Sequence, residues 1–316
     1  MAASMRGGVS GLIASSALRI SARDHTVSLL VVLFLLLVLV SAYLGWSATH
    51  TVNAIYLKAA EMFRARGAEL PINPIGDTPP LSLLRNLTTY VVLIGALSGI
   101  VLGHRVVAGD RKAGVLPLLA SRPLSRHAYA LGKLAATAIA IVGVLGLAAA
   151  ISVLTLLLLP GLSLPASAWA NLVAFLGASA LYMLAFGMIG LLCAMLMQSE
   201  SVALLVPVLI WSTLTFVVPQ LTANINPMAA LNPLSANAAP PDHAFFHWMG
   251  AVLGPLSLVE SYRLVAASLL DYLPPELADT SLGAPMASLV IADAALFVGV
   301  LVAVRRMDFS RGDFDD

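Results

Sequence analysis

The chain has 316 residues, of which 59% are hydrophobic and only 10% charged, and its formal net charge is +1. Soluble proteins carry about 25% charged residues, and a soluble core has no place for this much apolar material. We therefore predict an all-α polytopic membrane protein. The small net charge argues against a nucleic-acid partner. The single cysteine, Cys193, excludes a disulfide framework and a cysteine-based metal site.

Residues 1–25 precede the first apolar run. They carry apolar residues on one helical arc, namely Val9, Leu12, Ile13 and Ile20. Arg19 and Arg23 lie close to that arc, where their side chains can reach lipid head groups. This pattern predicts an amphipathic helix lying along the membrane interface. A frayed tail is the alternative.

Six stretches are long and apolar enough to cross a bilayer, which takes about 20 helical residues. The predicted spans are residues 26–46, 87–103, 134–159, 169–197, 202–221 and 285–304. Residues 47–82 and 222–284 are predicted outer segments, and residues 104–133 a cytoplasmic loop. With both termini in the cytoplasm, twelve Lys and Arg residues lie inside and five outside. This bias supports that orientation.

The second outer segment contains two features of interest. Residues 250–270 are apolar, but Pro255, Glu260 and Arg263 argue against a complete span, so we predict a re-entrant or interfacial helical hairpin. His243 and His247 are spaced i, i+4, which would suit a soft metal such as copper if the segment is helical. The plain alternative is an aromatic, amphipathic segment at the outer interface.

The loop between the second and third spans is strongly basic. It also contains a small apolar patch of Val115, Leu116, Leu118 and Leu119, which a solvated linker would not need. We predict that the leucines insert into a groove of a cytoplasmic protein. Charged residues would fix the register, namely Asp110, Arg111, Lys112, Arg122 and Arg126. The basic ones could equally be ordinary positive-inside anchors.

Enzyme motifs are missing from the sequence. There is no H-E-x-x-H and no phosphate-binding G-x-x-x-x-G-K-[ST], so ATP, if it drives this protein, is bound by another polypeptide. Asp293 is the one clear acid within a predicted span. Such acids tend to face a partner or a wet path, which would suit an ion-coupled secondary transporter. A structural hydrogen bond to a neighbouring Ser or Thr is the alternative.

With these features placed, the chain resembles the transmembrane subunit of an ABC-2 type ABC transporter, and most closely permeases of the copper-processing (nitrous-oxide reductase maturation) type. Such permeases carry an acid, then G-T-L-x-x-L-L-[ST]-x-P-[LIV]-[SG]-R, then G-K entering the third span. Asp110 stands for the acid. The residues that carry the resemblance after it are Gly114, Leu116, Leu118, Leu119, Ser121, Pro123, Leu124, Ser125, Arg126, Gly132 and Lys133.

This sequence departs from the family pattern within that loop. Val115 replaces the usual threonine. Pro117 falls inside the short cytoplasmic helix, called the coupling helix, by which the resemblance implies docking on an ATPase, and an interior proline would interrupt that helix. A second similarity is Glu260-Ser261-Tyr262-Arg263, which is like the D-x-Y-R near the last outer segment of such permeases.

The resemblance implies a permease subunit, acting as an exporter in the inner membrane of a prokaryote. Two permeases, identical or different, would dock on two copies of a cytoplasmic ATPase, which binds ATP and Mg²⁺ in place of any cofactor on this chain. Lipid and an extracytoplasmic accessory protein are further expected partners. The implied docking residues are Asp110, Arg111, Lys112, Gly114, Leu116, Leu118, Leu119, Arg122, Pro123 and Arg126. A secondary carrier, a membrane enzyme and a structural subunit are the rival hypotheses.

Overall fold

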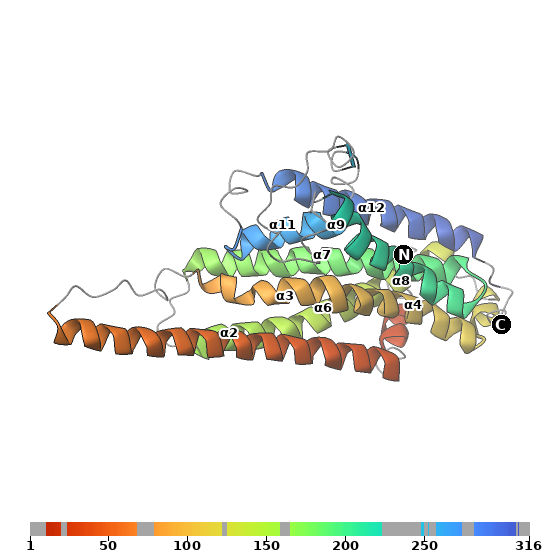
Figure 1. The fold of residues 1–316 in the computed structure, drawn as a ribbon. Coiled ribbons are helices and arrows are strands. Elements are labelled where there is room, and N and C mark those ends of the chain that lie inside the picture. The colour runs from red at the N-terminus through yellow and green to blue at the C-terminus, as the bar shows by residue number, and fades with distance from the viewer. Residues whose placement is uncertain are drawn as a thin grey trace.

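The computed structural model describes residues 11–19, 24–67, 79–121, 125–158, 165–222, 248–249, 252, 257–273, 281–307 and 309. Throughout these residues the regular secondary structure is helical (Figure 1). Six helical segments are long and apolar enough to cross a membrane. The prediction of an all-α polytopic membrane protein with six spans is therefore confirmed.

The six membrane-crossing segments include several short breaks in regular α-helix. The first segment is α2 (His25–Ala65), and the second runs without a gap through η1 (Pro80–Leu84), α3 (Arg85–Tyr90), η2 (Val91–Gly95) and α4 (Ala96–Lys112). The third and fourth segments are α6 (Arg126–Leu158) and α7 (Ala166–Leu196). The fifth joins α8 (Glu200–Ser212), η3 (Thr213–Val217) and α9 (Val218–Thr222), and the sixth is α12 (Gly283–Arg306). Two further helices, α5 (Val115–Ala120) and α11 (Leu258–Leu269), lie between them.

Helix α2 continues well past residue 46, where the sequence predicted the first span to end. The helix has 41 residues and is therefore about 61 Å long, twice the roughly 30 Å of a hydrocarbon core. It starts where the Asp24 side chain accepts hydrogen bonds from the N–H groups of Thr26 and Val27. It ends at Ala65, and the chain turns away two residues later at Gly67, whose φ of +66° suits glycine. The predicted outer segment thus begins with helix, and α2 projects beyond its neighbours (Figure 1).

Helix α7 lies in the centre of the bundle and packs against α4, α6, α8, α11 and α12 (Figure 1). Its approach to α4 is the closest. Glycines stand on both sides of this crossing, at Gly99, Gly103, Gly187 and Gly190, and a Cβ atom on any of them would meet the opposite helix. Small residues matter here because helices in a bilayer associate through close packing and not through the hydrophobic effect.

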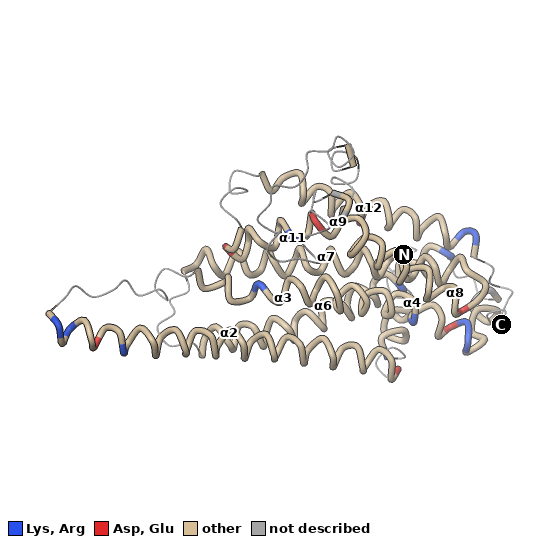
Figure 2. The backbone as a smooth tube through the Cα atoms, in the orientation of Figure 1, with Lys and Arg blue, Asp and Glu red and all other residues tan. Residues whose placement is uncertain are grey.

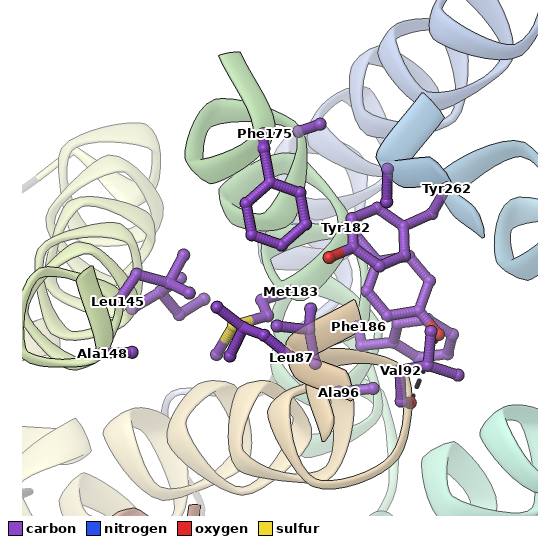
Figure 3. Close-up of a cluster of buried hydrophobic side chains, with 14 of the residues drawn as sticks. Leu87, Val92, Ala96, Leu145, Ala148, Phe175, Tyr182, Met183, Phe186 and Tyr262 are labelled. Carbon is purple, nitrogen blue, oxygen red and sulfur yellow. Dashed lines mark hydrogen bonds between the residues drawn. The ribbon is translucent and has the colours of Figure 1, made fainter. Parts of the chain in front are cut away.

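The buried apolar side chains form one large cluster in the body of the bundle and a second one at the end that carries α5. In the large cluster Tyr182 stacks on Tyr262, with ring centroids 4.6 Å apart, and Phe186 lies edge-on to Tyr182 (Figure 3). The second cluster joins residues from six segments, among them Ala14, Leu116, Tyr129, Met195, Val304 and Met307.

Residues 11–19 are helical, as predicted for the N-terminal segment, and they contact the second cluster. Their buried side chains are Ala14 and Ala17, whereas Leu12 is 71% exposed. Leu12 of the apolar arc therefore faces outward, Ile13 is half-buried, and the helix packs on the bundle through its alanines. Its position at the membrane interface stays a prediction. Val9, Ile20 and Arg23 lie outside the described residues.

Candidate functional site

The connection between the second and third spans is mostly helical, although the sequence predicted a loop over residues 104–133. Helix α4 runs on to Lys112, and α6 already begins at Arg126. The chain turns between α4 and α5 at Gly114, where φ is +60°. An L-residue would be strained in this left-handed conformation. The turn therefore gives a physical reason for the glycine of the loop motif.

Pro117 does not interrupt the coupling helix, contrary to the expectation from the sequence. It is the third residue of α5, and the N–H groups of a first helical turn have no intrahelical acceptor to lose. The Pro117 carbonyl accepts a hydrogen bond from the N–H of Ser121 at 3.2 Å. The proline is thus compatible with this helix because of its place in the first turn.

The apolar side chains of α5 divide between the core and the surface. Leu116 is completely buried in the second cluster, so it is not available to insert into a partner, and this part of the prediction is corrected. Leu118 is 66% exposed. The side chain of Leu119 lies outside the described structure, as do Arg122 and Pro123.

Asp110 and Lys133 form a buried ion pair at the base of this connection. Lys133 Nζ lies 2.7 Å from Asp110 Oδ2, and the hydroxyl of Tyr129 donates to the same oxygen at 2.9 Å. Both charged residues are less than one-tenth exposed. The acid and the lysine that bracket the loop motif are therefore bonded to each other. No pattern in the sequence indicated this pairing, and Asp110 was expected to contact a partner protein instead.

Arg111 and Arg126 also bond to other parts of this chain. The buried Arg111 guanidinium donates to the carbonyl oxygens of Met197 at 2.8 Å and Met195 at 3.0 Å, which ties α4 to the end of α7. Arg126 is exposed and donates to the Arg305 carbonyl at 2.6 Å. Their role in docking, like that of the other proposed residues, rests on position in the motif.

A second set of ion pairs links the start of α2, α4 and α8. Arg105 lies 3.3 Å from Asp24 and 3.5 Å from Glu200, and Lys112 lies 2.9 Å from Glu200. Partial burial raises the pKa of Asp24, but the N–H of Thr26 and the Arg105 guanidinium outweigh this effect and leave the pKa below its ordinary value. Figure 2 shows charged residues gathered where α4 ends and α8 begins.

The second sequence motif, Glu260-Ser261-Tyr262-Arg263, lies in α11, which packs against α3, α7 and α12. Tyr262 is fully buried, and its hydroxyl lies 2.8 Å from the hydroxyl of Ser179 on α7. Glu260 lies in the first turn, where its N–H donates to the Ser257 side chain, and Arg263 is exposed. Helix α11 is consistent with one arm of the predicted hairpin; most of residues 223–256 lie outside the described structure.

Replacing Tyr262 by phenylalanine is expected to lower the free energy of unfolding by about 1 kcal/mol, because one buried hydrogen bond is lost while the aromatic stack is kept. Ser179 retains its bond to the Phe175 carbonyl, so its hydroxyl is not stranded. Thermal unfolding of the purified variant in detergent would measure the change. A loss as large as that of Tyr262→Ala would contradict this account.

The structure places the remaining candidate residues as follows. Asp293 is 9% exposed on the inner face of α12, and neither of its carboxyl oxygens has a hydrogen-bond partner. His243 and His247 lie outside the described residues. Within the described part of the chain, no group of three or more His, Cys, Asp or Glu side chains could hold a metal ion.

Six apolar helices long enough to cross a membrane define a multi-pass membrane protein. The profile of the ABC-2 family transporter protein matches residues 12–311. The chain therefore belongs to this family, whose members are permease subunits that work with a cytoplasmic ATPase subunit and typically lack an ATPase site of their own. Comparison with curated proteins gives no match.

Proposed function

We propose that this chain is the membrane subunit of an ATP-driven exporter and that α5 is the surface on which the ATPase subunit docks. The observation that supports the proposal is the difference in exposure between two leucine side chains of α5. Leu116 is buried and anchors the helix to the bundle, whereas Leu118, two residues later, is 66% exposed. An exposed apolar side chain on a helix that is anchored to the bundle can enter an apolar groove of a partner.

The bonds around α5 support a role in transmitting force. The Asp110–Lys133 pair joins the helix that precedes α5 to the helix that follows it, and Arg111 joins α4 to α7. A displacement of α5 would therefore move three spans together, because a buried ion pair cannot be stretched without exposing its charges to an apolar medium. In this mechanism ATP binding and hydrolysis on the partner rock these spans.

The assembly that follows has two permeases and two ATPase subunits, with ATP and Mg²⁺ on the ATPase. The basic residues that gather near α5 support the placement of this end on the cytoplasmic side, as expected in the inner membrane of a prokaryote. Export as the direction, and kinship with the copper-processing permeases, rest on the loop motif. Lipid and an extracytoplasmic accessory protein complete the proposed partners.

An ion-coupled secondary transporter is the second candidate function. It is favoured by one observation, the unpartnered carboxyl group of Asp293 within a span. A secondary carrier would couple the binding of an ion at this residue to the movement of its substrate. It would need no ATPase subunit, which makes the two candidates separable by one experiment.

Changing Leu118 to Asp is expected to lower the amount of co-purifying ATPase subunit at least about tenfold, which corresponds to about 1.4 kcal/mol of binding free energy. A charge cannot enter an apolar groove without a partner, and the bundle itself is spared because Leu118 packs on little. The tagged protein would be purified from its own membranes in mild detergent and its ATPase activity measured.

Phe63→Asp is the matched control. Phe63 is 42% exposed near the other end of α2, so the same charge change there should leave the ATPase bound. Leu116→Asp should instead reduce the yield of folded protein. A chain that purifies alone and transports only with an ion gradient would contradict the permease proposal and favour the secondary carrier.

A further inference from the structure

Helix α12 directs one carboxyl group into the bundle. Its buried residues recur along a single face, at Leu289, Asp293, Val300, Ala303 and Val304. On the other side Ile291 is 67% and Val298 58% exposed, whereas Asp293 is 9% exposed. The carboxyl group is therefore turned toward the protein and away from lipid.

Asp293 is also deep within the span. It lies ten residues after Gly283 and thirteen before Arg306, which places it about 15 Å and about 20 Å from the two ends of the helix. A hydrocarbon core is about 30 Å thick. The short aspartate side chain cannot reach water from this depth, unlike a snorkelling lysine or arginine.

The carboxyl group has no partner, and in this respect it differs from the other buried ions that the structure describes. Asp110 and Lys133 are paired with each other, and Arg111 donates to two carbonyl oxygens. Both carboxyl oxygens of Asp293 lack a hydrogen bond. A charge at the middle of a membrane costs at least about 2.5 kcal/mol, so the charged form of this acid is disfavoured unless a cation lies beside it.

The residues next to Asp293 along α12 are apolar. Leu289, one turn earlier, belongs to the large core cluster, and Met286, Ala292 and Leu296 pack against that cluster. Hydroxyl groups of the same cluster are bonded elsewhere, since the Ser179 and Tyr262 hydroxyls are bonded to each other. A lone acid in such surroundings suits a ligand with one positive charge and an apolar body.

We propose that Asp293 binds the positively charged group of a hydrophobic ammonium compound, and that this class of molecule is what the permease carries. The substrate assignment rests on the proposed function. When the cation arrives, the carboxyl O–H bond breaks and the proton leaves for water, so that an ion pair replaces a neutral acid. When the cation departs, the proton returns. The site thus stays electrically neutral in both states.

Dicyclohexylcarbodiimide tests this proposal because it reacts with protonated carboxyl groups in apolar surroundings. The carboxyl oxygen bonds to the central carbon of the carbodiimide, its proton moves to a nitrogen, and the acyl group migrates to give a stable N-acylurea without a leaving group. The purified chain in neutral detergent would be labelled, digested and analysed by mass spectrometry. Octyltrimethylammonium is the cationic probe, and octanol is the neutral control with the same chain length.

Asp293 should be labelled, and a concentration of octyltrimethylammonium about ten times its Kd should slow the labelling about tenfold. Octanol should not. Asp293→Asn should lose the adduct, Asp293→Glu should keep it, and Glu61→Gln, an exposed change on α2, should alter neither labelling nor protection. Size-exclusion profiles would show that each variant is folded.

Several results would overturn the proposal. Labelling that the ammonium probe does not slow would leave Asp293 a neutral structural acid, and protection by Na⁺ alone would favour an ion-coupling site. Absence of any adduct on the folded protein would mean that the carboxyl group is not neutral. The assay contains no ATPase subunit, so its failure is distinct from a failure of the docking experiment.

Discussion

Replacing Lys133 by methionine is expected to lower the free energy of unfolding by about 3–5 kcal/mol. Lys133 is 1% exposed and is the only cation paired with Asp110 in the described structure. Its removal leaves a buried carboxylate with only the Tyr129 hydroxyl as a donor. The loss would appear as a marked drop in the thermal unfolding midpoint of the purified protein.

The double variant Asp110→Leu with Lys133→Met provides the control. Removing both charges removes the stranded ion as well, and apolar replacements of a buried pair are often neutral or better. The double variant should therefore be more stable than Lys133→Met alone, with a coupling free energy well above the 0.5 kcal/mol typical of independent sites. Additive losses in the two single variants would show that the pair is not coupled.

If the ion pair also transmits force, the same double variant should be folded but defective. It should retain the ATPase subunit on Leu118 while the coupling between ATP hydrolysis and substrate movement weakens. The ratio of transport to hydrolysis in proteoliposomes would measure this effect. An unchanged ratio would restrict the Asp110–Lys133 pair to stability.

Changing Gly103 to alanine is expected to cost about 3 kcal/mol or more, at the upper end of the cost of overpacking. A Cβ atom at this position would overlap the carbonyl oxygen of Gly187 and also crowd the Leu191 N–H. The obstacle is backbone, which cannot rotate away as a side chain can. The α4–α7 crossing would have to open along its whole length, and the yield of folded protein should fall accordingly.

Gly146→Ala on α6 is the matched control for the glycine experiment. A Cβ atom there meets nothing within 4 Å, and alanine is favoured over glycine in a helix by about 1 kcal/mol. Its unfolding midpoint should therefore stay the same or rise. If Gly103→Ala behaved like Gly146→Ala, the close crossing of α4 and α7 would not be essential to the fold.

The sequence predicted most of the fold because membrane solvation acts on each span separately. Twenty apolar residues in a row must form a helix that satisfies its own backbone, so spans could be recognised without knowing their neighbours. The residues at which the helices end were harder to predict. Residues 47–65 are polar enough for water, yet they continue α2, because helical propensity and the absence of proline act beyond the membrane as well.

The candidate site could be located from the sequence but not resolved into roles. The loop motif directed attention to this segment, and Asp110, Leu116 and Lys133 all belong to it. Whether a given leucine is buried or exposed depends on which helices surround α5, and Leu116 and Leu118 differ only in that respect. The partner of Asp110 is 23 positions away along the chain, a distance that no local pattern encodes.

The sequence by itself determined the class of protein and the number of spans, since these follow from hydrophobicity and charge summed along the chain. Only the tertiary structure decided which charged side chains are paired with other groups of the same chain. It pairs Asp110 with Lys133 and leaves Asp293 alone. The reason is physical: the cost of a buried ion depends on what lies next to it in space, and its neighbours come from other helices.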